Sequence, residues 1–287
     1  GHLDPLGDTP LDHVDEGSTG VVTRVSDRDN AVLRHLAEIG LRPDSPVEVV
    51  SRQVELGIIS VSLAGRVVQV PLVTANGAFQ LDTPRVQAAL RADPAIRLVF
   101  LCSPGNPTGT LLPLRDVQQI LDTPEFGGVV VVDEAYIDFA AEEQALGRKH
   151  GTEPVSAVSL VHEYANVIVA QTLSKSFGLA GVRLGLAFAQ PPIVQVLNNT
   201  KAPYNISSPA AYLASQALSA EGVARMRANV HALLDERERL CRALAPIPAT
   251  GAVLGSNDAN FVLVQVLDRP GGVPDRQRAA HVYETMA

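Results

Sequence analysis

The chain has 287 residues, of which 46% are hydrophobic, and its formal net charge at pH 7 is -8. This length and apolar content suffice for the core of one large or two ordinary domains, while the acidic balance argues against a general affinity for nucleic-acid phosphates. Because no stretch approaches the roughly 20 consecutive apolar residues of a membrane span, we predict a cytoplasmic protein with no nucleic-acid and no membrane partner.

Acidic residues are concentrated in the first fifth of the chain. Residues 1–57 hold 11 acidic and 5 basic side chains, against 20 and 18 in the remainder. Within this segment, residues 20–25 and 46–52 alternate like strands, and residues 30–41 have apolar positions at helical spacing. The pattern predicts a small β-rich unit with one short helix over residues 1–57.

From about residue 58 the pattern changes to apolar strands that alternate with helical segments. Strands are predicted at residues 65–72, 97–102, 128–133, 166–171 and 185–189, and helices at 84–92 and 114–121. The alternation predicts an α/β domain whose mostly parallel sheet is covered by helices on both faces.

The pattern changes again in the last third of the chain. Two helices are predicted within residues 208–246, followed by a strand at 260–266 and a terminal helix at 275–287. We therefore predict a large domain over residues 58–219 and part of a smaller α+β domain over residues 220–287.

Polar residues follow three of the predicted strands directly. These segments read SPGNPTG (103–109), DEAYIDF (133–139) and TLSKSFGLAGVRLG (172–185). Each alone has a structural explanation, as a Pro/Gly/Asn turn, a helix N-cap or a tight strand turn. Because ligands of open α/β sheets bind beyond the carboxyl ends of the strands, however, all three should project onto one edge. Their conjunction in this order favours a binding site.

In this order, the three segments resemble the signature of fold-type-I pyridoxal-phosphate-dependent aminotransferases. The longer segments FLCSPGNPTG, VVVDEAYIDF and TLSKSFGLAGVRLG are especially similar to those of histidinol-phosphate aminotransferases. The resemblance implies pyridoxal 5'-phosphate as the cofactor and Lys175 as the catalytic Schiff-base lysine, which also moves a proton at the substrate's α-carbon.

Further cofactor contacts follow from the same resemblance. Asp133 would pair with the pyridinium nitrogen and keep the ring able to accept electron density. Asn106 and Tyr136 would hydrogen-bond the phenolic oxygen of the ring, and Ser174 and Arg183 would hold the phosphate, for which a guanidinium offers a planar array of donors. No metal is expected in this site.

The resemblance also implies a reaction and its partners. Histidinol phosphate would exchange its amino group with 2-oxoglutarate, a step of histidine biosynthesis, so the small-molecule partners are an amino donor and a 2-oxo acid, and a homodimer is expected. Enzymes that act on aromatic amino acids or decarboxylate phosphothreonine share much of the signature. The signature therefore specifies the cofactor more strongly than the substrate.

The likeness covers residues 58–287 and lacks family segments at both ends, including about ninety N-terminal residues by the usual size of such domains and the arginine that binds the substrate carboxylate. Residues 1–57 instead resemble the Src-homology-like barrel at the C-terminus of diphtheria-toxin-repressor-type metal-dependent regulators, and small ferrous-transport accessory proteins. We therefore expect a chimeric chain, truncated at both ends of its aminotransferase part, with impaired turnover. The alternative is a non-catalytic regulatory or interaction protein that carries an aminotransferase remnant.

Overall fold

The computed structural model describes residues 14–15, 17–22, 46–53, 58–62 and 67–286. The chain divides into two compact units, residues 1–69 and 70–287. The predicted domain boundaries after residues 57 and 219 stay predictions.

The first unit contains an antiparallel sheet. Its strands are β1 (Thr19–Val21), β2 (Pro46–Gln53) and β3 (Ile58–Ser62), hydrogen-bonded in the order β1-β2-β3. The strand expected at residues 46–52 is therefore present, whereas the helix expected at residues 30–41 lies outside the described residues.

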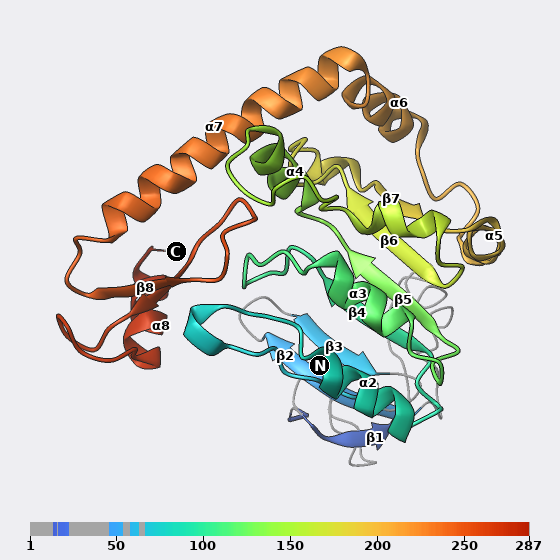
Figure 1. Ribbon diagram of the computed structural model, residues 1–287, viewed down its shortest axis with the longest axis horizontal. Helices are drawn as coiled ribbons and strands as arrows, with labels where there is room; N and C mark the ends of the chain where they lie inside the picture. The colour runs from blue at the N-terminus through green and yellow to red at the C-terminus, as the bar shows by residue number, and fades with distance from the viewer. Residues whose placement is uncertain (1–13, 16, 23–45, 54–57, 63–66, 287) are drawn as a thin grey trace, which may run out of the picture. The chain divides into compact units, whose positions relative to one another are not determined.

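The second unit is built on a four-stranded sheet (Figure 1). Its strands, in spatial order, are β4 (Leu98–Cys102), β5 (Val129–Asp133), β6 (Val167–Thr172) and β7 (Gly185–Phe188). The first three run parallel and β7 runs antiparallel to β6, which confirms a mostly parallel sheet.

The strand expected at residues 65–72, which spans the division between the two units, is wrong over its described part. Residues 67–72 form no strand, and the side chains of Val67 and Val68 are 51% and 38% exposed. Apolar alternation favours an extended chain, but a strand also needs a neighbour with which to exchange backbone hydrogen bonds, so the pattern alone was insufficient.

Helices surround the sheet and continue beyond it. They are α2 (Thr83–Ala92), α3 (Leu114–Leu121), α4 (Ile137–Ala145), α5 (Pro191–Thr200), α6 (Ser208–Ala217), α7 (Ala220–Leu244) and α8 (Arg276–Met286). A second, two-stranded sheet pairs β8 (Thr250–Leu254) with β9 (Leu263–Val266) in antiparallel fashion. Within the described ranges, none of the helices has both the length and the apolar content to cross a membrane.

The main core lies on one face of the four-stranded sheet. Along β5 the side chains of Val130 and Val132 are fully buried while those of Val129 and Val131 are less so, as the alternation of a strand requires. Buried residues of α2, α3 and the 3-10 helix η4 (Ala157–His162) pack against them. This packing holds the strand ends that carry the three polar segments.

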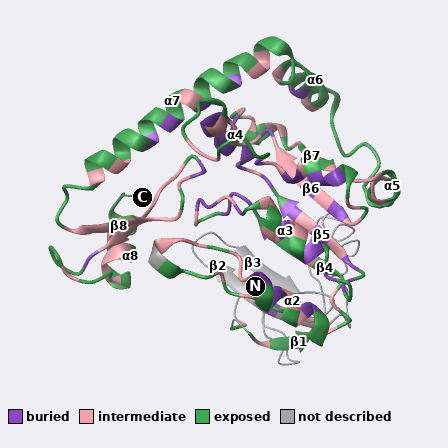
Figure 2. Ribbon diagram, in the orientation of Figure 1, coloured by how far each residue is buried: buried purple, intermediate pink, exposed green. Residues whose placement is uncertain are grey.

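A second apolar cluster joins α4 to the long helix α7. Figure 2 shows α7 mostly exposed, with buried residues at intervals. The apolar ones among them, Met226, Val230 and Leu234, recur every four positions and so share one helix face. They pack with Tyr136 and Phe139, and thereby fix the start of α4.

Candidate active site

All six predicted site residues leave the sheet at one edge. Cys102 pairs with Asp133 at the carboxyl ends of β4 and β5, and the parallel β6 ends at the same side. Because β7 is antiparallel, its first residue Gly185 pairs with Thr172 at the end of β6, which brings the chain around Arg183 to this edge as well. The six residues are Asn106, Asp133, Tyr136, Ser174, Lys175 and Arg183.

Three of them make direct contacts. The amide Nδ2 of Asn106 donates to the Tyr136 hydroxyl at 3.4 Å, and Nζ of Lys175 lies 5.4 Å from the centroid of the Tyr136 ring. Tyr136 is buried and its ring stands edge-on to that of Phe261, with the centroids 5.2 Å apart. We call Asn106, Tyr136 and Lys175 the lysine cluster. The amine of Lys175 and the amide of Asn106 are on exposed side chains, and both groups lie next to the buried Tyr136.

The other three residues bond within their own turns. The exposed Asp133 carboxylate accepts a backbone amide of its own turn at 3.0 Å, and the Ser174 hydroxyl accepts from Thr172 at 2.8 Å. Arg183 adopts a left-handed φ of 55°, and its guanidinium donates to the carbonyl of Ala180 at 2.9 Å. No hydrogen bond among the described residues joins these three to the lysine cluster; the bonds that are present stay within their own turns.

Glu134 is a buried carboxylate that the sequence analysis missed. Its side chain accepts from the Ser156 hydroxyl at 2.7 Å, the Ala157 amide at 2.6 Å and the Gln171 amide at 2.8 Å. Burial raises the pKa of the Glu134 carboxyl, and these hydrogen bonds partly offset the shift. Glu134 thus ties the end of β5 to η4 and to β6, the strand that leads to Lys175.

We expect Glu134→Ala to lower the free energy of unfolding by about 2–4 kcal/mol, because buried donors would lose their acceptor. Urea unfolding followed by circular dichroism measures the change. The matched control Glu163→Ala removes an exposed carboxylate and should stay within about 0.5 kcal/mol of the wild type. Equal free energies of unfolding for the two variants would show that the hydrogen bonds of Glu134 do not stabilise the fold.

Asp258 holds the loop that carries Asn106, and was also missed. It is 1% exposed, its carboxylate accepts the Leu111 amide at 3.0 Å, and its own amide donates to the Gly109 carbonyl at 2.7 Å. At Gly255, which has a φ of +76°, a β-carbon would lie 1.8 Å from the Thr108 carbonyl oxygen. Only glycine permits this approach of the segment after β8 to the loop after β4.

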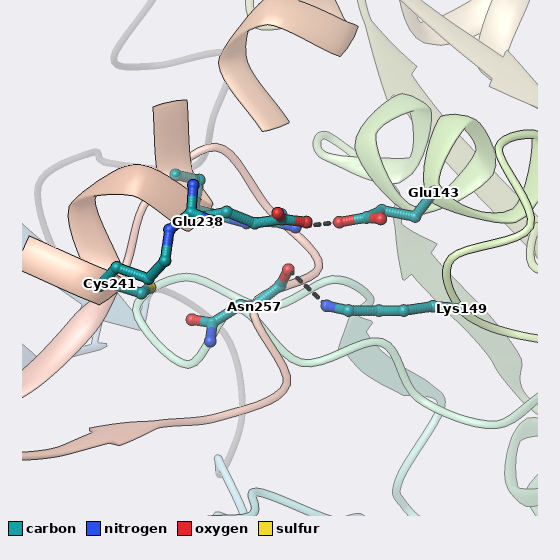
Figure 3. Close-up of a pocket in the computed structure, with 7 residues that line it drawn as sticks. Glu143, Lys149, Glu238, Cys241 and Asn257 are labelled. Atoms are coloured by element: carbon teal, nitrogen blue, oxygen red, sulfur yellow. Dashed lines mark hydrogen bonds and ion pairs between the residues drawn. The ribbon is translucent and has the colours of Figure 1, made fainter. Parts of the chain in front are cut away.

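A cavity of about 340 Å³ lies beside this segment, between the end of α4 and α7 (Figure 3). It is lined by Glu143, Lys149, Arg237, Glu238, Cys241, Arg242 and Asn257. None of the six predicted site residues belongs to it. Nζ of Lys149 donates to the carbonyls of Ser256 at 2.7 Å and Asn257 at 3.0 Å, so this amine already has partners.

Comparisons with known proteins agree with the geometry. Residues 58–284 match the profile of Aminotransferase class I and II, and residues 9–76 match that of the FeoA domain. The chain is 44% identical over 232 residues to histidinol-phosphate aminotransferase of Schizosaccharomyces pombe, which is 80% of this chain and 58% of that protein. The enzyme of the same name from Candida maltosa is 40% identical over 222 residues, 76% of this chain and 53% of that protein. The chain thus spans little more than half the length of these curated relatives.

Solved structures show the same fold. Histidinol-phosphate aminotransferase from Sinorhizobium meliloti, in complex with pyridoxal-5'-phosphate, has a TM-score of 0.57 at 25% identity and covers 71% of this chain and 50% of its own. A decarboxylase from Sulfurospirillum multivorans has a TM-score of 0.58 at 28% identity, with 70% and 54% covered. These structures confirm the predicted fold type I, and the FeoA-domain match of residues 9–76 is consistent with the predicted chimeric chain. The chain belongs to the aminotransferase class I and II family.

Proposed function

We propose that this chain uses pyridoxal 5'-phosphate to transfer the amino group of histidinol phosphate to 2-oxoglutarate, a step of histidine biosynthesis. The observation that carries the proposal is the lysine cluster, in which the amine of Lys175 lies 5.4 Å from the ring centroid of Tyr136 at the carboxyl edge of a mostly parallel sheet. Identities of 44% and 40% to two histidinol-phosphate aminotransferases support the substrate class.

The side chains at this edge suit the cofactor. When bound, pyridoxal phosphate supplies an aldehyde that reacts with amines and a ring that accepts electron density from the substrate. The Lys175 amine would be the nucleophile for the aldehyde, and the exposed carboxylate of Asp133 would be the partner for the ring nitrogen. The hydroxyl of Ser174 and the guanidinium of Arg183 offer donors to the phosphate.

Lys175 has a second task in the reaction. After the substrate amine has displaced it from the cofactor, the Lys175 amine would move a proton from the substrate α-carbon to the cofactor. A positioned base of this kind contributes about 10²–10⁴-fold to the rate. Tyr136, held by Phe261 and bonded to Asn106, gives that amine a fixed neighbour and offers a hydroxyl to the cofactor's phenolic oxygen.

We extend the proposal to the organisation of the protein. The small-molecule partners are an amino donor and a 2-oxo acid, the assembly is a homodimer, and the compartment is the cytoplasm. The start of the family profile at residue 58 supports a domain boundary after residue 57, whereas the FeoA-domain match extends to residue 76 and the compact units divide after residue 69. The start of α7 at Ala220 supports the second boundary, between residues 58–219 and 220–287.

The test is an absorbance titration of the purified protein with pyridoxal phosphate, followed by borohydride reduction and peptide mapping. A visible band with the label on Lys175 is expected, together with loss of the band on addition of histidinol phosphate. The absence of a band, or label spread over Lys149 and Lys201, would overturn the proposal. That result would leave the non-catalytic alternative, in which the aminotransferase part is a remnant.

A further inference from the structure

A second contact fixes the loop one residue after Lys175. The hydroxyl of Ser176 donates to Oδ2 of Asp138, in the first turn of α4. Ser176 is 5% exposed, whereas Lys175 is exposed. The loop therefore turns its serine inward and its lysine outward, and the consecutive residues Lys175 and Ser176 both contact the start of α4, through Tyr136 and Asp138.

Asp138 depends strongly on this hydrogen bond. Burial raises the pKa of its carboxyl, the hydrogen bond from Ser176 lowers it, and the nearby Glu142 raises it. In the described part of the chain, Ser176 is the side chain that donates to this carboxylate. A hydrogen bond to a charged group is among the stronger ones, and a half-buried carboxylate that loses its donor is destabilised. The pair is therefore a firm link between the lysine loop and α4.

Two backbone hydrogen bonds close the loop around Lys175. Leu173, on the N-terminal side, is 2% exposed, and its carbonyl accepts the amide of Leu179 at 3.0 Å. The Lys175 carbonyl accepts the amide of Gly178 at 3.1 Å. Neither bond attaches the loop to α4. Phe177 packs against the apolar cluster of Tyr136 and Phe139, and the Ser176–Asp138 hydrogen bond adds a polar link directly beside Lys175.

We propose that Ser176 and Asp138 are positioning residues that hold Lys175 against the Tyr136 ring in the orientation required to capture the cofactor. This role rests on the proposed function of Lys175. Neither residue touches the cofactor in this scheme. Their effect reaches the amine through the backbone of the loop.

The experiment compares the wild type, Ser176→Ala, Asp138→Asn and the control Ser215→Ala, which removes an exposed hydroxyl bonded to its own helix at 2.9 Å. One readout is the dissociation constant of pyridoxal phosphate, from absorbance. A second, in cofactor-free protein, is the rate at which acetic anhydride modifies Lys175, Lys149 and Lys201, from mass spectrometry. Thermal unfolding reports whether each variant folds.

We expect Ser176→Ala to weaken cofactor binding by about tenfold, as loss of a hydrogen bond to a charged group implies. Asp138→Asn keeps an acceptor for the serine and should have a smaller effect in the same direction. In both variants acetylation of Lys175 should rise severalfold, because the amine leaves the Tyr136 ring, while Lys149 and Lys201 react as in the wild type. Ser215→Ala should match the wild type in every readout.

Unchanged binding and unchanged acetylation of Lys175 in Ser176→Ala would overturn the inference. So would a rise at all three lysines together with a lower unfolding temperature, because that pattern marks a general structural role. If the wild type binds no cofactor, the proposed function fails, yet a selective rise at Lys175 would still establish the positioning contact.

Discussion

Replacing Lys175 with alanine is expected to reduce the borohydride-fixed cofactor to background and to lower any transamination rate by at least about 10²–10⁴-fold. The amine is both the attachment point and the base in the proposed reaction, so no other group can take over. Peptide mapping after reduction measures the first effect, and the rate of band loss with histidinol phosphate measures the second.

The other two lysines of the chain are matched controls for this variant. Nζ of Lys149 is occupied by the carbonyls of Ser256 and Asn257 and pairs with Asp258 at 3.4 Å, and Lys201 is exposed at the end of α5. Lys149→Ala and Lys201→Ala should therefore keep the full label on Lys175. If Lys175→Ala still takes up a stoichiometric label, then Lys175 is not the cofactor lysine.

Local patterns of the sequence were enough to predict most of the sheet. Strands such as Val129–Asp133 and Val167–Thr172 have runs of β-branched residues that end in polar segments, and both strands are where they were predicted. Because ligands of open α/β sheets bind beyond the carboxyl ends of the strands, all six site residues were expected at one edge of the sheet. The contacts of Tyr136 with Asn106 and Lys175 agree with that placement.

The supporting carboxylates could not be predicted in the same way. Glu134 and Asp138 stand in the segment DEAYIDF, but their partners Ser156 and Ser176 come from elements far along the chain. Asp258 contacts the loop after β4 across 147 residues of sequence. Such pairs depend on how the elements pack against one another. The hydrophobic periodicity of a sequence indicates only which face of an element is apolar, so it does not predict these pairs. The helix α4 was missed because its segment was interpreted through its chemistry alone.

The largest expected effect on stability concerns the ion pair of Arg237 and Glu143 beside the cavity (Figure 3). Their side chains are 5% and 1% exposed, and Arg237 also donates to the Ala259 carbonyl at 2.7 Å. Oε2 of Glu143 has no hydrogen-bond partner among the described residues, and Arg237 is the cation in direct contact with this carboxylate there. We expect Arg237→Met to lower the free energy of unfolding by about 3–5 kcal/mol, because it leaves an uncompensated buried carboxylate.

The double variant Arg237→Met/Glu143→Leu separates this cause from loss of packing. Removing both charges removes the desolvation cost as well, so most of the lost stability should return, less about 1 kcal/mol for the Ala259 carbonyl that still lacks its donor. The control Arg239→Met breaks an exposed pair with Glu236, 68% and 60% exposed, and should cost less than about 1 kcal/mol. Urea unfolding of the four proteins gives the comparison. If the double variant is less stable than Arg237→Met, the pair contributes through its shape and contacts, and the unpaired charge is not the cause.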